Sequence, residues 1–223
     1  MITLHASKAL KDLCAKQDIF TVYDLLSKEE NKILRNKTNQ VALQEGMIFI
    51  EDKSGTNIDV QIFDSSKIDF SHTEFEFDSK KEAPVIIVMD YAFGEQAYET
   101  IDELLKPFKT AEKKIHLNVD SISVMGKAGI LEGSKGDIMI PSAHIFEGTA
   151  DNYPFKNELT LKDFDTKDIK TFEGTMVTVL GTSLQNKDLL KFFHDSTWNV
   201  IGLEMEGAHY QKAIQSASKV RHS

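Results

Sequence analysis

The stretch VIGLEMEGAHYQKAI, residues 200–214, places two carboxylates where a buried strand is followed by a helix. Residues 200–203 form an apolar run that is typical of a strand, and a helical segment begins after residue 206. Glu204 and Glu206 therefore lie at the carboxyl end of the expected strand. In open α/β sheets, ligands bind at the carboxyl ends of the strands. The two acids are thus candidate binding residues, because a core is a poor place for charge.

Other apolar runs predict the sheet to which this strand belongs. They are DSISVMG (120–126), GDIMIPSA (136–143), GTMVTVLG (174–181), NVIGLEM (199–205) and VIIVMDYAFG (85–94). The last run is nearly continuous, as expected of a strand covered on both faces, and a helical segment (94–108) follows it. Strands that alternate with helices predict an α/β fold with a mostly parallel central sheet flanked by helices.

Residues 1–82 differ from the rest and are expected to form an N-terminal extension of helices and short strands. Residues 8–17 and 21–36 have helical apolar spacing, whereas residues 44–52, 55–64 and 73–78 alternate as half-buried strands do. We therefore expect two parts, the extension (1–82) and an α/β core (83–223).

Composition excludes several classes of function. The net charge of −9 argues against a nucleic-acid partner. No apolar run approaches the roughly 18 residues of a membrane span, and no signal peptide opens the chain, so we expect a cytoplasmic protein without a membrane partner. Cys14 is the single cysteine, and no zinc-type spacing exists, so no metal site is expected. Only Arg35 and Arg221 are arginines, which leaves little to grip a phosphate bidentately.

A glycine-rich loop lies in SVMGKAGILEGSKGDIMIPSA, residues 123–143. Its spacing fits neither a Walker loop nor the dinucleotide-binding fingerprint, which disfavours a nicotinamide-dependent enzyme. Backbone amides at Gly126 and Gly129 are able to cradle an anion or a sugar hydroxyl. A plain turn at the end of a strand is the alternative interpretation.

Together these segments resemble the purine nucleoside phosphorylase and nucleosidase family, which includes methylthioadenosine and AMP nucleosidases. GKAGILEGSKGDIMIP is similar to that family's glycine loop followed by Gly-Asp and a strand, and GLEMEGAHY matches its Glu-Met-Glu-[Ala/Gly]-Ala motif. The resemblance covers residues 83–215. It implies a nucleoside phosphorylase-like fold, a homo-oligomer, and a substrate site formed by Glu204, Met205, Glu206, Gly126, Lys127, Ala128 and Gly129.

Within that resemblance, Glu206 is the expected catalytic residue and binds the ribose hydroxyls, while Met205 packs against the sugar. Cleavage of an N-glycosidic bond develops positive charge on the ribose, and a fixed carboxylate stabilises this charge where little water is present. The alternative is that Glu206 caps the following helix, where negative charge is favourable.

The match to the family is incomplete. Lys127 stands where family phosphorylases have serine, and either binds phosphate as a point charge or is a solvated surface residue. The family's Ser-Asp, which protonates the leaving base, is not found before Ser223, so the core is expected to be C-terminally incomplete or to have lost the acid.

Other candidate residues are less specific. Candidates for stacking on the base are Tyr153, Phe155, Phe192 and Phe193, and Glu147, Thr149 and Asp151 lie on a loop that either faces the ligand or is solvated. His144 and His209 are expected to be packing residues rather than ligands.

The leading hypothesis is cleavage of the N-glycosidic bond of a purine nucleoside or nucleotide, by hydrolysis or by phosphorolysis. Phosphate is then a possible co-substrate, and no other cofactor is expected. The alternative is a non-catalytic nucleoside-binding or interaction module that has lost the general acid.

Overall fold

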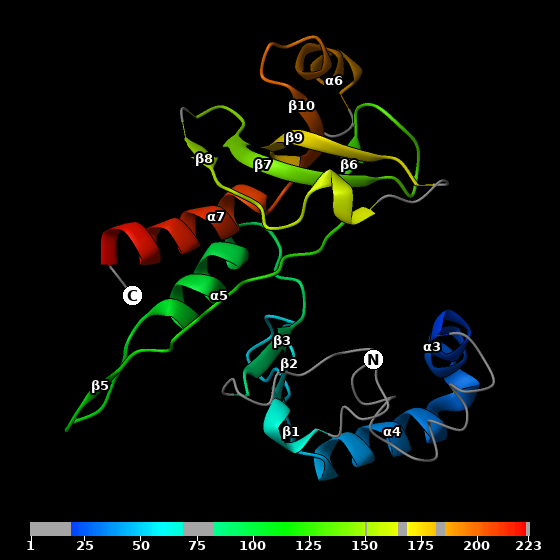
Figure 1. The fold of residues 1–223 in the computed structure, drawn as a ribbon, viewed down its shortest axis with the longest axis vertical. Helices are drawn as coiled ribbons and strands as arrows, with labels where there is room; N and C mark the ends of the chain where they lie inside the picture. The colour runs from blue at the N-terminus through cyan, green and yellow to red at the C-terminus, as the bar shows by residue number, and fades with distance from the viewer. Residues whose placement is uncertain (1–18, 69–82, 150, 165–168, 182–185, 222–223) are drawn as a thin grey trace. The chain divides into compact units, whose positions relative to one another are not determined.

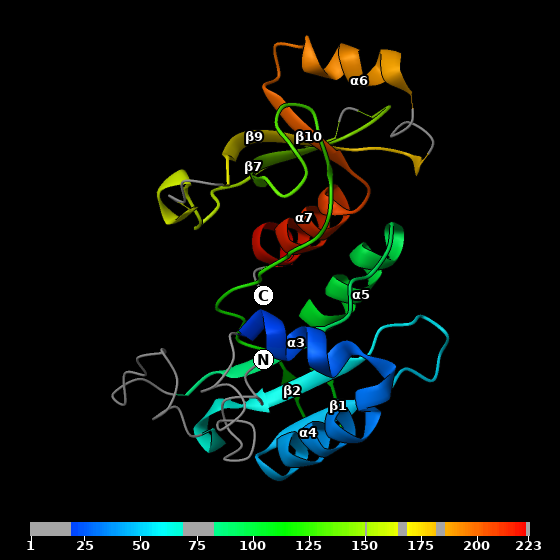
Figure 2. The same cartoon turned by 90° about the vertical axis from the view of Figure 1, so that its right-hand side faces the viewer.

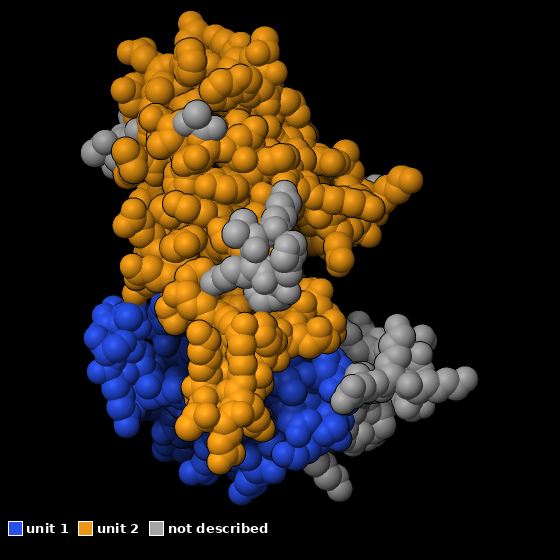
Figure 3. Space-filling model, turned by 90° about the vertical axis from the view of Figure 1, so that its left-hand side faces the viewer, with its two compact units in different colours: residues 1–90 blue, residues 91–223 orange. Residues whose placement is uncertain are grey.

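The computed structural model describes residues 19–68, 83–149, 151–164, 169–181 and 186–221. The chain forms two compact units, residues 1–90 and 91–223, which are coloured separately in Figure 3. The division falls after Asp90 rather than after residue 82, because the strand that follows residue 84 joins the sheet of the first unit.

In its described residues, 19–68 and 83–90, the first unit combines two helices with a three-stranded antiparallel sheet in the order β1-β2-β3 (Figure 2). Its elements are α3 (Ile19–Ser27), a 3-10 turn (Glu29–Asn31), α4 (Lys32–Gln44), β1 (Met47–Ile50), β2 (Val60–Asp64), a second 3-10 turn (Ser65–Lys67) and β3 (Val85–Met89). The helix expected over 21–36 and the strands expected over 44–52 and 55–64 are confirmed, although the helical residues split between α3 and α4. The segments 8–17 and 73–78 lie outside the described residues.

The core of the first unit lies on one face of this sheet. Ala42 of α4 is buried with Met47 and Phe63, and Ile68 and Ile86 pack against them. Met47 is opposite Phe63 in β2, which is opposite Ile86 in β3, so the three point to the same side. Because successive side chains of a strand point to opposite faces, the residues between these lie on the other face of the sheet.

β3 corrects one expectation. Its run VIIVM was expected to be a core strand covered on both faces, but it pairs antiparallel with β2. Val85 and Val88 are 61% and 45% exposed. An apolar run indicates a strand, but it carries no information about pairing direction, which depends on distant partners.

The second unit contains a mixed five-stranded sheet in the order β6-β10-β9-β7-β8. Its strands are β6 (Gly129–Ile130), β7 (Ile138–Phe146), β8 (Asn152–Pro154), β9 (Thr171–Thr178) and β10 (Val200–Glu204). The three central strands β10, β9 and β7 are parallel, and the edge strands are antiparallel to them. An α/β fold is therefore confirmed, with a sheet that is mixed rather than mostly parallel.

The strands expected over 136–143, 174–181 and 199–205 are confirmed as β7, β9 and β10. The strand expected over 120–126 is wrong, because residues 120–126 form no strand and all but Ile122 are exposed. Only Gly129–Ile130, just beyond the run, enters the sheet.

Helices cover both faces of the second sheet (Figure 1): α6 (Lys187–His194) lies on one face, and α7 (Gly207–Gln215) lies on the other with α5 (Glu95–Leu105) packed against it. α5 is the helix expected over 94–108. A π-helical turn (Ser216–Arg221) continues α7. The unit also contains a 3-10 turn (Leu161–Phe164) and a short hairpin of β4 (Phe108–Lys109) and β5 (Lys114–Ile115).

The core of the second unit centres on β9 and β10. Val177 and Leu203 are fully buried, and Phe193 of α6 packs with them. Gly202 allows Met139 and β6 to lie close to β10, because an added Cβ would lie 2.5 Å from Met139 Sδ and 2.9 Å from the Gly129 carbonyl oxygen. In the part of the chain that the structure describes, no helix is both long and apolar enough to cross a bilayer.

Candidate functional site

The carboxyl ends of the three parallel strands bring polar side chains together. Glu204 ends β10, Thr178 ends β9, and His144 lies near the end of β7. All three are buried. Parallel strands end at the same edge of a sheet, which is where α/β proteins bind ligands, so the expected position of the acids is confirmed.

Glu204 is held by four hydrogen bonds. One carboxylate oxygen accepts from the backbone N–H groups of Glu206, at 2.6 Å, and of Gly207. The other oxygen accepts from the Thr178 hydroxyl and pairs with His144 Nδ1 at 3.2 Å. Burial alone would raise the pKa of Glu204, but the hydrogen bonds from His144, Thr178 and Gly207 bring this pKa below its ordinary value.

These bonds fix the start of α7. The first N–H groups of a helix have no partner within it, and here Glu204 accepts two of them while Thr178 Oγ1 accepts the Ala208 N–H at 2.9 Å. Glu206 occupies the N-cap position, but its side chain makes no capping hydrogen bond. Glu206 therefore does not cap α7 through a side-chain hydrogen bond, and Glu204 accepts these N–H groups instead.

Gly207 is required by the same close packing. A Cβ at this position would lie 2.1 Å from His144 Cε1 and 2.9 Å from a carboxylate oxygen of Glu204. The glycine of the Glu-Met-Glu-Gly-Ala run thus allows the imidazole ring to reach Glu204.

Glu206 is buried differently. Its side chain is 7% exposed, and its carboxylate accepts a hydrogen bond from the Gly94 N–H, at the start of α5, at 3.2 Å. Across the described ranges, no salt bridge involves Glu206. Burial, together with the charge of Glu204, raises the pKa of Glu206.

Aromatic residues lie beside Glu206. Tyr91 packs edge-on against Tyr210, with ring centroids 5.7 Å apart, and against Phe93 at 6.1 Å. The Tyr210 hydroxyl accepts the Ala92 N–H at 3.2 Å, which ties α7 to the segment before α5. Burial and the nearby Glu206 carboxylate raise the pKa of Tyr91. Glu206 therefore has an aromatic and partly apolar surrounding.

The glycine loop comes to the same edge of the sheet. Gly129 lies opposite Leu203 in the antiparallel pair of β6 and β10. Gly126 lies against Tyr91, because a Cβ on Gly126 would be 2.8 Å from the Tyr91 hydroxyl oxygen. The structure thus brings both loop glycines to the edge of the sheet that holds Glu204 and Glu206.

Exposed side chains complete this edge. Lys127, Ala128 and Met205 are exposed, Met205 at 36%. Met125 and Phe93, which adjoin Gly126 and Gly94 in sequence, are 92% and 70% exposed. The segments that carry Gly94, Gly126 and Glu206 therefore also present large apolar side chains to solvent.

The candidate aromatic residues have different surroundings. Phe155 stacks on His144 with centroids 5.7 Å apart, Tyr153 packs edge-on against Phe146, and Phe193 belongs to the core. Phe192 lies 61% exposed on α6. Among these four, Phe155 is linked to the acid cluster, by which we mean Glu204, Glu206, His144 and Thr178, through its stacking on His144.

The other candidates are positioned as follows. His144 pairs with the Glu204 carboxylate at 3.2 Å, and His209 packs edge-on against Phe146 with ring centroids 4.7 Å apart, so both rings have partners within the protein. Glu147 accepts the Leu180 N–H at 2.9 Å, and the exposed Thr149 and Asp151 bond to each other.

Sequence reasoning missed Tyr91 and Thr178. Thr178 lies in the expected strand 174–181, so the rule that selected the two glutamates would also have selected it. Tyr91 follows an apolar run in the same way. The packing of Tyr91 beside Glu206 has no signal in the sequence.

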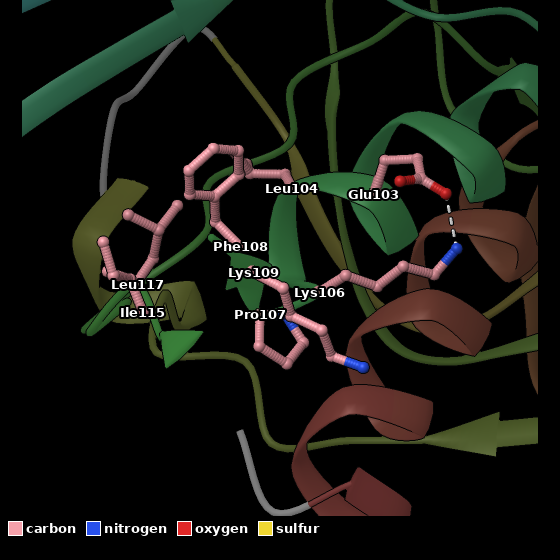
Figure 4. Close-up of a pocket in the computed structure, with 8 residues that line it drawn as sticks. All are labelled: Glu103, Leu104, Lys106, Pro107, Phe108, Lys109, Ile115 and Leu117. Carbon is pink, nitrogen blue, oxygen red and sulfur yellow. Dashed lines mark hydrogen bonds and ion pairs between the residues drawn. The ribbon is translucent and has the colours of Figure 1, made fainter. Parts of the chain in front are cut away.

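A cavity of about 360 Å³ lies elsewhere in the second unit (Figure 4). It is lined by Glu103, Leu104, Lys106, Pro107, Phe108, Lys109, Ile115 and Leu117. These residues surround the C-terminal end of α5, about 15 Å along the helix from Gly94 at its other end. The cavity is therefore separate from the acid cluster, and its lining is mainly aliphatic and aromatic.

Within the described ranges, no group of three or more His, Cys, Asp or Glu side chains is arranged to hold a metal ion. No curated protein and no solved structure matches the chain. Residues 18–223 match the model of a family of unknown function (DUF6909), and the chain belongs to that family.

Proposed function

We propose that this protein cleaves the N-glycosidic bond of a purine nucleoside or nucleotide, with Glu206 as the catalytic carboxylate. The observation that carries the proposal is the buried Glu206 carboxylate, which has no ion-pair partner among the described residues and lies at the edge of the sheet where the parallel strands end. A buried charge without a partner is costly, and ionisable groups with perturbed pKa values concentrate at functional sites.

The chemistry of the bond explains why such a group is useful. When the bond between the ribose C1′ and the base nitrogen breaks, the base takes the electron pair and the ribose ring becomes positively charged. Glu206 then supplies the opposite charge in a place with little water, where the attraction is strong. Ribose hydroxyls donate hydrogen bonds to the same carboxylate. Water or phosphate attacks C1′, and the base nitrogen that leaves with the electron pair takes up a proton from solvent, which balances the proton that an attacking water loses.

Glu204 takes a positioning role in this proposal. Both of its oxygens are occupied by protein donors, so it orients the turn that carries Glu206 instead of contacting the sugar. Met205 is exposed beside it and provides an apolar surface for the sugar. The backbone of the Gly126–Gly129 loop and the Lys127 side chain then bind the phosphate or the attacking water.

Base release tests the proposal directly. The protein is incubated with adenosine, inosine, AMP and methylthioadenosine, with and without phosphate, and free base is measured by chromatography. We expect release from at least one substrate, and a loss of about 10²–10³-fold in Glu206→Gln with unchanged circular dichroism. Glu158→Gln, at an exposed glutamate, is the control. Full activity in Glu206→Gln would exclude the catalytic role, and no release from any substrate would exclude the reaction for these compounds.

A second candidate function is nucleoside binding without turnover. The observation that favours it is that Glu204 is fully engaged, so it is not available to protonate the leaving base. A nucleoside that raises the midpoint of thermal unfolding, without base release, would support this module.

A further inference from the structure

The segment KIHLNVD, residues 114–120, has the pattern of a strand with one apolar face. Ile115, Leu117 and Val119 alternate with polar residues at 114, 116, 118 and 120. Because successive side chains of a strand point to opposite faces, the three apolar side chains would share one face.

In the structure, this pattern is largely unpaired. Lys114 and Ile115 form β5 and pair with Lys109 and Phe108 of β4. Among the described residues, no strand pairs with residues 116–120, and residues 108–121 are all exposed. Figure 1 shows this hairpin projecting from the C-terminal end of α5. The edge of β5 that faces away from β4 is therefore open.

The apolar face continues into the cavity of Figure 4. Ile115 and Leu117 line this cavity together with Leu104, Pro107 and Phe108. Phe108, Leu117 and Val119 are 67%, 50% and 40% exposed. An open strand edge beside exposed apolar side chains is a template for pairing with another strand.

We propose that residues 114–120 pair with the same residues of a second copy of this chain, as antiparallel strands related by a two-fold axis at Leu117. In this register, Lys114 lies opposite the partner's Asp120, and Ile115 lies opposite the partner's Val119. Leu117 lies opposite the partner's Leu117. The outermost pairs thus combine opposite charges, and the pairs at 115/119 and at 117 combine apolar side chains, both of which stabilise antiparallel strands.

Other registers lack this match. Shifting the axis by two residues places Leu117 opposite a lysine (Lys113) or a serine (Ser121) of the partner. Parallel pairing in register places Lys114 opposite the partner's Lys114 and Asp120 opposite the partner's Asp120, and like charges that lie directly opposite each other destabilise a sheet. The antiparallel register joins β4 and β5 of both copies into one four-stranded sheet, with the same surface used by each copy, as two-fold symmetry requires.

Sedimentation velocity of the full chain over a range of concentrations tests the proposal, and we expect a dimer. Leu117→Lys places two lysines opposite each other on the axis and is expected to weaken the dimer more than tenfold. The control is Leu159→Lys, because Leu159 is exposed to a similar extent, 53%, and lies outside the segment. A monomer at all concentrations, or a dimer that Leu117→Lys leaves intact, would overturn the proposal.

A charge exchange tests the register. Lys114→Glu and Asp120→Lys each create like-charge pairs at both ends of the paired strands and are expected to weaken the dimer by about tenfold. The double variant restores opposite charges and is expected to recover the original dissociation constant within about twofold. Failure of this recovery would overturn the antiparallel register. Because mass is measured rather than base release, the outcome does not depend on the proposed function.

Discussion

The two sheets of this protein consist of similar apolar strands but differ in how they bury them. β10 is buried along its whole length, with strands on both sides and helices over both faces of its sheet. Among the described strands β3 lies at the edge of its sheet, and Val85 and Val88 are 61% and 45% exposed. Burial therefore depends on neighbouring strands and helices and not on the hydrophobicity of the run itself.

The same difference applies to acidic residues. Asp52, in the turn after β1, accepts hydrogen bonds from Ser54 and from the Asn57 N–H in an exposed loop, and the bonds from Ser54 lower its pKa. Glu204 makes comparable bonds in the interior of the second unit, where hydrogen bonds are stronger and an unpaired donor is costly. We therefore expect changes at the edge of the second sheet to have much larger effects than changes at exposed positions.

The largest effect is expected for Glu204→Gln. Glutamine offers one acceptor oxygen where glutamate has two. Its NH₂ group, which only donates, therefore faces either the N–H groups of Glu206 and Gly207 or the side chains of Thr178 and His144, and hydrogen bonds that Glu204 accepts are lost. We expect a loss of about 3–5 kcal/mol in the free energy of unfolding. Urea titration followed by the fluorescence of Trp198, the only tryptophan, measures the second unit. A loss no larger than that of Glu158→Gln would contradict the role of the network.

Gly207→Ala is expected to be next. The added methyl group collides with the His144 ring, and overfilling a packed interior costs about 1–3 kcal/mol. Gly181→Ala is the matched control, because its Cβ would have no neighbour within 4 Å. The same fluorescence titration applies, and equal stability of the two variants would show that His144 moves away without cost.

A matched pair of valines compares the two sheets directly. Val177 of β9 is fully buried and Val88 of β3 is 45% exposed. We expect Val177→Ala to lose about 1.5–3 kcal/mol and Val88→Ala less than about 1 kcal/mol. Fluorescence and far-ultraviolet circular dichroism report the two changes. Equal losses would mean that the exposed face of β3 is covered in solution.

The smallest effect is expected from the titration of Glu206. Its pKa is raised in the folded state above the ordinary 4.5, so folding favours the protonated form. The stability that protonation provides is present below the unfolded pKa and is lost as the pH rises through the folded pKa. Relative to Glu206→Gln, the natural protein should therefore lose stability as the pH rises above about 4.5. A difference between the two proteins that stays constant from pH 4 to 8 would contradict a raised pKa.

Several elements could be predicted from the sequence because their signals are local. The apolar runs at 136–143, 174–181 and 199–205 mark β7, β9 and β10, and the apolar spacing after Gly94 marks α5. The run at 120–126 was also expected to be a strand but forms none, which shows that apolar residues in a run do not by themselves supply the neighbouring strand that a ladder of hydrogen bonds requires. The location of the candidate site, at the carboxyl ends of the strands, could also be predicted, because the two acids come at the end of an apolar run.

The sequence by itself determined that two carboxylates lie at the carboxyl end of a buried strand, since hydrophobic periodicity is a property of neighbouring residues. Only the tertiary structure decided their separate roles. Glu204 receives its partners from Thr178 and His144, which are 26 and 60 residues away along the chain, whereas Glu206 is buried beside Tyr91 and accepts a hydrogen bond from the Gly94 N–H. The charge state and function of a carboxylate depend on its desolvation and on such distant donors, and neither is encoded in the adjacent residues.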